Sequence, residues 1–214
     1  RTVDLSPDSV TIYQMEIPFN TTVFQEMKVA GQEVAPVADW QTKRRWVNEA
    51  FERLEASGYT VTSAYTAVKN PGKTRFCYRD FLWTGADLIG LGVASFSHIG
   101  GTHYQNQQEL PEYKDSLLAG RLPIYRALTP SLEERLIREL ILQLKLGQVQ
   151  PSYFLKKFKI DVNKRFAGTL SRLKSQKYLH VGNDNWSLRR EGLLQVDSLL
   201  EDFFLEKHQN SRYT

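Results

Sequence analysis

The spacing of apolar and polar positions predicts strands and one long helix in the first half of the chain. Residues 8–17 alternate β-branched or aromatic positions with others, which predicts a strand. Residues 40–57 follow the helical period, and Asp39 precedes them as an N-cap. Residues 59–68 are again strand-like, and the apolar run 86–93, bounded by glycines, predicts a strand buried on both faces of a parallel sheet.

The second half has mainly the helical period. Helices are predicted at residues 110–119, 131–146, 151–158 and 161–176, a β-hairpin at 178–188 and a last helix at 190–206. Thr129 and Pro130 suit the N-cap and first position of the second of these helices. This order of elements is typical of a winged-helix module. We therefore predict an α/β fold with a boundary near residue 106, the second domain being mainly helical and winged-helix-like.

Composition and cysteine content exclude several classes of protein. The chain has 214 residues, 41% of them hydrophobic and 24% charged, which suits a folded protein. The single cysteine, Cys77, excludes an internal disulfide and a multi-cysteine metal site, and its apolar neighbours predict a buried side chain. No apolar run reaches the ~20 residues of a membrane span, and no signal-peptide pattern is present. We therefore expect a cytoplasmic protein. Because the chain does not begin with methionine, we also expect a fragment or processed piece.

Charge is unevenly distributed along the chain. Residues 1–105 carry a net charge of −1 and residues 106–214 a net charge of +5. Within residues 156–177, eight lysines and arginines accompany one acid, Asp161. In a winged-helix order the helix at 161–176 is the recognition helix, so this run predicts nucleic-acid binding. The alternative is a solvated helix face.

A glycine-rich segment, residues 90–101, is the first candidate for chemistry. Glycines after a strand allow close approach to a ligand, whereas turn glycines serve structure alone; the pattern leaves both open. Ser97 and His98 are neighbours on an extended chain and point to opposite faces, which argues against a serine hydrolase. A metal site usually needs an acidic or thiol ligand beside its histidines, and the sequence places none near His98 and His103. The two histidines are therefore weak candidates for metal ligands.

Residues 85–106, GADLIGLGVASFSHIGGTHYQN, resemble the oxygen-independent coproporphyrinogen III oxidase family, which includes haem-chaperone relatives. Further matches are Tyr113 before Gly120–Pro123, Thr129–Glu134, Leu188–Gly192 and Asp8–Pro18. The resemblance covers nearly the whole chain. It implies the last strands of a partial (β/α)6 radical S-adenosylmethionine barrel in residues 1–106 and the family's C-terminal domain in residues 107–214.

The resemblance also implies a reaction and a set of residues. In the family, a 4Fe–4S cluster cleaves S-adenosylmethionine, and the resulting radical starts oxidative decarboxylation of porphyrinogen propionates. The positions that match the cofactor site are Met15, Phe96, Gly90 and Gly92, with Tyr13 and Glu16 on the strand of Met15. Gln105 and Asn106 match a pair near the substrate. Arg121, Arg126 and Lys145 are candidates for pairing with propionates.

One departure from the family is an absence. The family holds its cluster with a Cys-x-x-x-Cys-x-x-Cys motif, and this chain has one cysteine in another context. The cluster ligands are therefore expected from a missing N-terminal barrel half, or the parent protein lacks a cluster. In the second case the function is non-catalytic haem or tetrapyrrole binding, with His98 and His103 as candidate axial ligands. The winged-helix nucleic-acid alternative leaves residues 85–106 unexplained.

Overall fold

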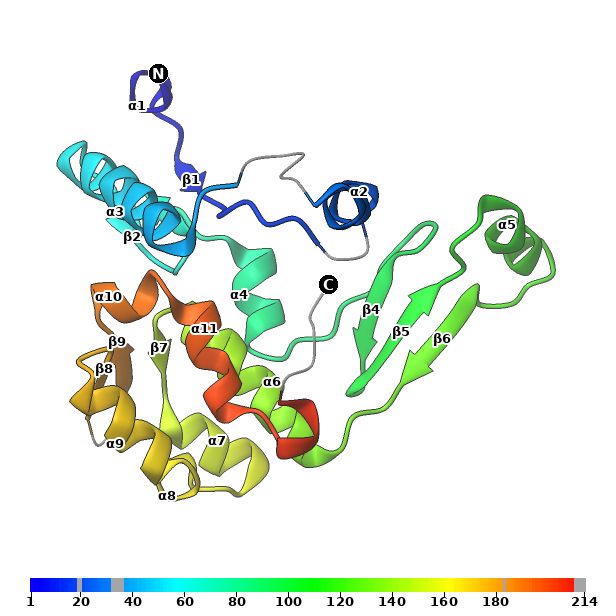
Figure 1. Cartoon of the computed structure of the whole chain (residues 1–214). Coiled ribbons are helices and arrows are strands. Elements are labelled where there is room, and N and C mark those ends of the chain that lie inside the picture. Colours follow the sequence, from blue (N-terminus) through cyan, green and yellow to red (C-terminus); the bar gives the residue numbers. More distant parts are fainter. Residues whose placement is uncertain (19–20, 32–36, 183, 210–214) are drawn as a thin grey trace. The chain divides into compact units, whose positions relative to one another are not determined.

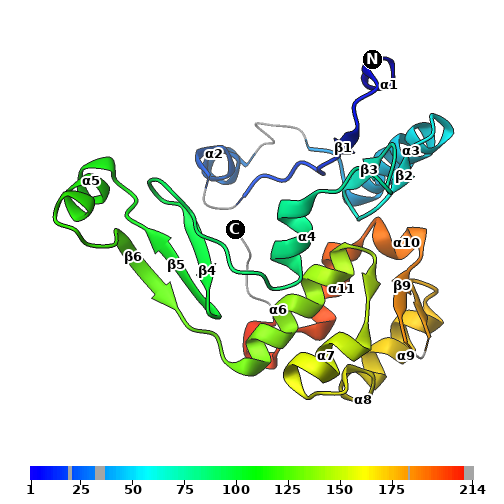
Figure 2. The ribbon, with the colours of Figure 1, turned by 180° about the vertical axis from the view of Figure 1, so that it is seen from behind.

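The computed structural model describes residues 1–18, 21–31, 37–182 and 184–209 (Figures 1 and 2). The chain forms two compact units. Unit 1 contains Arg1–Arg75, Leu144–Pro151 and Val162–Thr214, and unit 2 contains Phe76–Gln143 and Ser152–Asp161. The predicted mixed α/β class is confirmed. In the described residues, however, the three sheets each have three antiparallel strands, and none closes into a barrel.

The first part of unit 1 is a small sheet with a long helix. Its elements are α1 (Thr2–Leu5), β1 (Ser9–Thr11), α2 (Thr22–Ala30), α3 (Trp40–Ala56), β2 (Thr60–Val61) and β3 (Thr66–Val68), and the strand order is β1-β3-β2. The predicted helix at 40–57 is confirmed as α3. Its predicted N-cap is confirmed as well, since the Asp39 carboxylate accepts the Thr42 N–H at 2.7 Å. Phe51 is fully buried, and the core around it includes Val47, Leu54 and Ala67.

Two predicted strands differ in the structure. The strand predicted at residues 8–17 is paired as a strand only over Ser9–Thr11, although half-buried and exposed positions continue to alternate as far as Met15. Residues 59–68 are two strands rather than one. The hydroxyl of Ser63 accepts the N–H groups of Tyr65 (3.2 Å) and Thr66 (3.1 Å), which turns the chain back on itself.

The second part of unit 1 is a sheet covered by short helices. Its elements are β7 (Gln148–Val149), α8 (Val162–Arg165), α9 (Ala167–Ser175), β8 (Leu179–Val181), β9 (Trp186–Leu188), α10 (Arg190–Leu193), α11 (Val196–Leu200) and the 3₁₀ turns Glu201–Phe203 and Glu206–His208. The predicted hairpin is confirmed, and β7 adds to it in the order β7-β9-β8. Trp186 fills the centre against Phe203, and its indole N–H donates to Asn163 at 2.8 Å. The helices predicted at 161–176 and 190–206 are each broken into shorter pieces.

Unit 2 combines a three-stranded sheet with helices. Its elements are α4 (Cys77–Trp83), β4 (Phe96–Ile99), β5 (Thr102–Asn106), α5 (Leu110–Leu118), β6 (Ile124–Leu128) and most of α6 (Leu132–Lys145) and α7 (Pro151–Phe158). The views in Figures 1 and 2 show β4, β5 and β6 side by side. The predicted cap of α6 was wrong by two residues: Ser131, not Thr129, accepts the Glu134 N–H, and Glu134 accepts the Ser131 N–H in return.

Two predictions in unit 2 were wrong. Residues 86–93 do not form a buried strand, because only Leu88 makes a bridge, to His98, and Ile89 and Leu91 are exposed. Cys77 is exposed rather than buried. Leu88 to Val93 is therefore a loop, and its backbone must find partners other than a neighbouring strand.

Candidate functional site

The loop at residues 88–94, called here the glycine loop, is held by the side chain of Asn106. This side chain is almost fully buried, with 4% of the residue exposed at the end of β5. Its Nδ2 donates to the carbonyl oxygens of Gly90 at 3.1 Å and Gly92 at 2.9 Å. One amide group thereby satisfies two backbone acceptors that would otherwise lack a protein partner at that position.

The N–H groups of both glycines are also used within unit 2. Gly90 donates to the hydroxyl of Ser97 at 3.0 Å, and Gly92 donates to the phenol oxygen of Tyr113 at 3.1 Å. A Cβ on Gly90 would overlap the carbonyl oxygen of Phe96, and Gly92 has a φ of +98°. The two glycines are thus required by the fold of the loop, whose amides face protein oxygens rather than an open anion cradle.

Gln105 fixes the end of the same loop. Its Nε2 donates to the carbonyl oxygen of Ala94 at 3.1 Å, and its Oε1 accepts from Arg126 Nε at 2.8 Å. Ala94 has a left-handed backbone, with a φ of +58°. The structure therefore gathers Gly90, Gly92 and the Gln–Asn pair around one loop. These bonds give both amides a role in positioning, and their contact with a substrate stays a prediction.

The outer surface of the glycine loop is apolar. Ile89 and Leu91 on the loop are exposed, as is Phe96 at the start of β4, and Leu91 has 84% of its surface accessible. We call these three residues the apolar rim. Exposed apolar side chains on and beside a loop whose backbone is fixed by hydrogen bonds make a preformed surface for an apolar ligand or chain segment.

The two histidines that the sequence singled out pack against each other. His98 on β4 lies opposite His103 on β5, with ring centroids 4.3 Å apart. His98 is only 6% exposed, and this burial is the main cause that lowers its pKa. The positive charge of Arg138 is the second cause. Burial, followed by the proximity of His98, lowers the pKa of His103 to about 4. Both imidazoles are therefore neutral near pH 7.

A charge cluster that sequence reasoning missed is built around the buried carboxylate of Glu139 and lies at the C-terminal end of α4. Lys157 Nζ donates to Glu139 Oε1 at 2.7 Å. The Tyr153 hydroxyl lies 2.6 Å from Glu139 Oε2 and 2.8 Å from the carbonyl oxygen of Thr84. Burial and the hydrogen bond to Glu139 raise the pKa of Tyr153. The spacing of Tyr153 and Lys157 by one helical turn was the available signal. The cluster ties α6 and α7 to the end of α4, four residues before the glycine loop.

Met15 lies in unit 1, in an apolar pocket of about 360 Å³. The pocket is lined by Ile12, Tyr13, Gln14, Met15, Val37, Ala38, Lys43, Trp46 and Val47. Tyr13 stacks on Tyr65 with ring centroids 6.0 Å apart. Sequence reasoning missed Trp46, although a tryptophan on the polar face of an amphipathic helix was a usable signal. An exposed aromatic beside a pocket is typical of a binding surface.

The three predicted propionate partners differ in their surroundings. Lys145 forms an ion pair with Asp197 at 2.8 Å and lies over the Tyr65 ring. Arg126 lies on the exposed strand β6, and its side chain donates a hydrogen bond to Gln105 on β5. Arg121 lies in the exposed loop before that strand. Arg126 and Arg121 are thus the two candidates for which the structure shows no carboxylate partner among its described residues.

Comparison with known proteins gives relatives that share one name. The chain is 24% identical over 231 aligned residues to the oxygen-independent coproporphyrinogen III oxidase of Thermostichus vulcanus, covering 100% of the chain and 69% of that protein. It is 41% identical over 112 residues to the enzyme of that name from Pseudomonas aeruginosa. The chain is similar to the oxygen-independent coproporphyrinogen III oxidases. The resemblance predicted from residues 85–106 is confirmed, although no family model matches the chain.

The fold of these oxidases is shared as well. The solved coproporphyrinogen III oxidase of Escherichia coli, described as a radical SAM enzyme, matches 94% of this chain with a TM-score of 0.70 at 18% identity. The chain spans about half of that solved chain (49%), and the Pseudomonas aeruginosa match covers 24% of that relative. The chain thus corresponds to a part of these oxidases.

The residues present do not fit the iron–sulfur cluster that the resemblance implies. Such a cluster is held by several cysteine thiolates, and this chain has only Cys77. The described residues also contain no group of three or more His, Cys, Asp and Glu side chains placed to hold a metal ion. No helix among those residues is long and apolar enough to cross a membrane.

Proposed function

We propose that this chain is the C-terminal part of a radical S-adenosylmethionine oxidoreductase that resembles oxygen-independent coproporphyrinogen III oxidase. Its substrate is a porphyrinogen whose propionates undergo oxidative decarboxylation. The observation that carries the proposal is the preformed glycine loop of residues 88–94, held by Asn106 and Gln105. This loop lies in the segment, residues 85–106, that resembles the oxidases.

S-adenosylmethionine, when bound to the complete enzyme, supplies the radical that removes a hydrogen atom from the substrate. The residues of this chain bind and orient. The apolar pocket at Met15, with Trp46 at its edge, suits the adenosyl group of the cofactor, which is flat and largely apolar on its faces. Phe96 at the start of β4 and the backbone of Gly90 and Gly92 on the glycine loop supply a second apolar surface.

The substrate side of the proposal rests on charge and exposure. Arg126 keeps its guanidinium in place through Gln105, which leaves its terminal nitrogens for a carboxylate. A guanidinium held by a buried amide loses less freedom on binding than an unrestrained one. Arg121 lies five residues earlier in the chain, on an exposed loop. These two residues are the proposed partners of the propionates.

The apolar rim supports the proposal that the rest of the barrel contributes to the enzyme. Ile89 and Leu91 are exposed, although the fold fixes the loop that carries them. Apolar side chains on a rigid loop are stabilised when another part of a protein covers them, by about 25 cal/mol for each Å² buried. We propose that the N-terminal barrel half covers them and supplies the cluster ligands.

The two methionines of the chain allow a test with an internal control. Met15 lines the pocket and Met27 lies on α2 outside it. The chain is labelled with ¹³C-methyl methionine, the signals are assigned with Met27→Leu, and S-adenosylmethionine is added. We expect the Met15 methyl signal to shift saturably while the Met27 signal stays constant. Equal shifts of both signals, or none in either, would contradict the cofactor role of Met15.

A further inference from the structure

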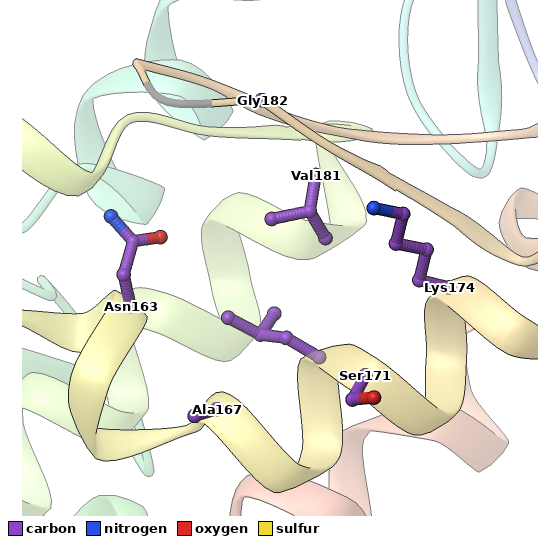
Figure 3. A pocket seen from close by; sticks show the side chains of 7 residues that line it. Asn163, Ala167, Ser171, Lys174, Val181 and Gly182 are labelled. Atoms are coloured by element: carbon purple, nitrogen blue, oxygen red, sulfur yellow. The ribbon is translucent and has the colours of Figure 1, made fainter.

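A second pocket lies in unit 1, far along the chain from Met15. It has a volume of about 480 Å³ and is lined by Asn163, Ala167, Leu170, Ser171, Lys174, Val181 and Gly182. Four of these residues follow the helical spacing of α9, Val181 is the last residue of β8, and Gly182 follows it (Figure 3). The pocket is within the size range of small-molecule sites. Neither the resemblance nor the proposed function uses it.

The pocket combines an apolar floor with polar groups. Leu170 is buried on α9, and Val181 points from β8 toward that helix (Figure 3). Lys174 and Ser171 lie on the same face of α9, one helical turn apart. The arrangement suits a ligand with an apolar body and an anionic end.

Lys174 and Ser171 have no hydrogen-bond or ion-pair partner in the part of the chain that the structure describes. Their neighbours on α9 are already engaged: Arg172 pairs with Asp202 at 2.5 Å, and the Ser175 hydroxyl donates to the carbonyl oxygen of Arg172 at 2.8 Å. The ammonium and the hydroxyl that face the pocket are therefore the donors of this helix that a ligand can use.

The sequence around the pocket strengthens its attraction for anions. Residues 162–182 contain five lysines and arginines and no aspartate or glutamate. The nearest acids along the sequence, Asp161 and Asp184, stand just outside that range, and in space Asp202 pairs with one of the five cations, Arg172. Among the residues that line the pocket, Lys174 carries the charge, and it is positive. Such a pocket favours an anion, and a phosphate ester carries about −1.5 to −2 at pH 7.

We propose that this pocket binds a small organic phosphate. The phosphate accepts from Lys174 Nζ and Ser171 Oγ, and the apolar body of the ligand lies on Leu170 and Val181. A bare anion uses only the polar half of such a pocket, so an organic phosphate binds more tightly than inorganic phosphate does. A nucleic-acid backbone offers the same phosphate chemistry but in a larger ligand, and the experiment separates the two sources.

The test uses phenyl phosphate as the probe, titrated into the ¹⁵N-labelled chain and followed by the amide signals of residues 163–182. We expect saturable shifts, an affinity at least fivefold higher than that of inorganic phosphate, and at least a fivefold loss in Lys174→Gln. Lys177→Asn is the matched control, because it removes an equal charge outside the pocket and asparagine tolerates the left-handed backbone there (φ +63°). We expect it to change the affinity less than twofold.

Val181→Thr tests the floor at nearly constant volume. This substitution is expected to weaken the binding of phenyl phosphate and to leave the binding of inorganic phosphate unchanged. Equal losses in Lys174→Gln and Lys177→Asn would show diffuse attraction and overturn the proposal, as would the absence of any shift with phenyl phosphate. A short DNA duplex that shifts these signals at concentrations where phenyl phosphate does not would overturn it in favour of a nucleic-acid surface.

Discussion

Asn106 shows how one side chain can replace a neighbouring strand. The sequence resemblance drew attention to Gln105 and Asn106 as residues near a substrate, and the structure shows each of them bonded to the backbone of the glycine loop. Residues 86–93 are apolar enough to read as a buried strand, yet the carbonyls of Gly90 and Gly92 are satisfied by an amide group. No periodicity rule can register a partner that is a side chain from elsewhere in the chain.

Substitution of Gly90 tests the packing of this loop. Gly90→Ala places a Cβ on the carbonyl oxygen of Phe96, a backbone atom that cannot move without disturbing β4. We expect a loss of stability of about 1–3 kcal/mol, as for other overpacked sites. Gly72→Ala is the control, because an added Cβ there meets no heavy atom within 4 Å. Urea unfolding followed by circular dichroism measures both. Similar midpoints for the two variants would mean that the loop does not pack as described.

Among the elements, those fixed by local signals could be predicted and those fixed by distant partners could not. Helix α3 was predictable because its cap, Asp39, and its apolar face lie within the helix sequence. The hairpin of β8 and β9 was predictable from its polar turn. The hairpin at residues 59–68 was missed because its turn depends on the Ser63 hydroxyl within a run of good strand formers. The third strand β7 was missed because two residues make no pattern.

The hairpin of β4 and β5 is expected to make stability depend on pH through His103. The pKa of His103 is about 4 in the folded chain and about 6.5 in the unfolded chain. Below pH 6.5 protonation of His103 therefore favours the unfolded chain. Stability should therefore fall as the pH drops from about 6.5 toward 4. The charged groups that act on the histidine pair are Arg138, Asp87, Arg135 and Lys157, of which Asp87 alone favours protonation.

His103→Gln is expected to reduce this loss of stability by about 1–2 kcal/mol, allowing for the partial exposure of His103. The measurement is urea unfolding at pH 7.0 and pH 4.5. His180→Gln serves as the control, because His180 is exposed on β8 in unit 1. If His103→Gln and His180→Gln lose equal stability over this pH range, the pairing of His98 with His103 is not its cause.

At the scale of the whole molecule, the candidate cofactor residues are divided between the two units. Met15 belongs to unit 1, and Phe96, Gly90 and Gly92 belong to unit 2. The similarity to the oxidases could be predicted from residues 85–106, because glycines and the Gln–Asn pair form a dense local motif. The division of the chain into two units could not be predicted, because unit 1 is built from stretches that are distant in sequence.

The chain alone is expected not to cleave S-adenosylmethionine, because its single cysteine cannot hold a 4Fe–4S cluster. The measurement is 5′-deoxyadenosine formed under anaerobic, reducing conditions after attempted cluster reconstitution. A characterised oxygen-independent coproporphyrinogen III oxidase, treated identically, shows that the assay works. About one mole of 5′-deoxyadenosine per mole of chain would refute the expectation. That result would require a cluster held in another way.

Unit 1 is assembled from three separate stretches, and this order affects how the protein can fold during its synthesis. The Ala64 N–H donates to the carbonyl oxygen of Lys145 at 2.9 Å, the Tyr65 hydroxyl donates to Asp197 at 2.7 Å, and Leu194 packs on the core around Phe51. On the ribosome, residues 1–75 therefore emerge long before the segments that complete them. Part of the core around Phe51 therefore lacks its covering residue Leu194 while unit 2 is being made. We expect the nascent chain to bind chaperones until α10 and α11 have left the exit tunnel.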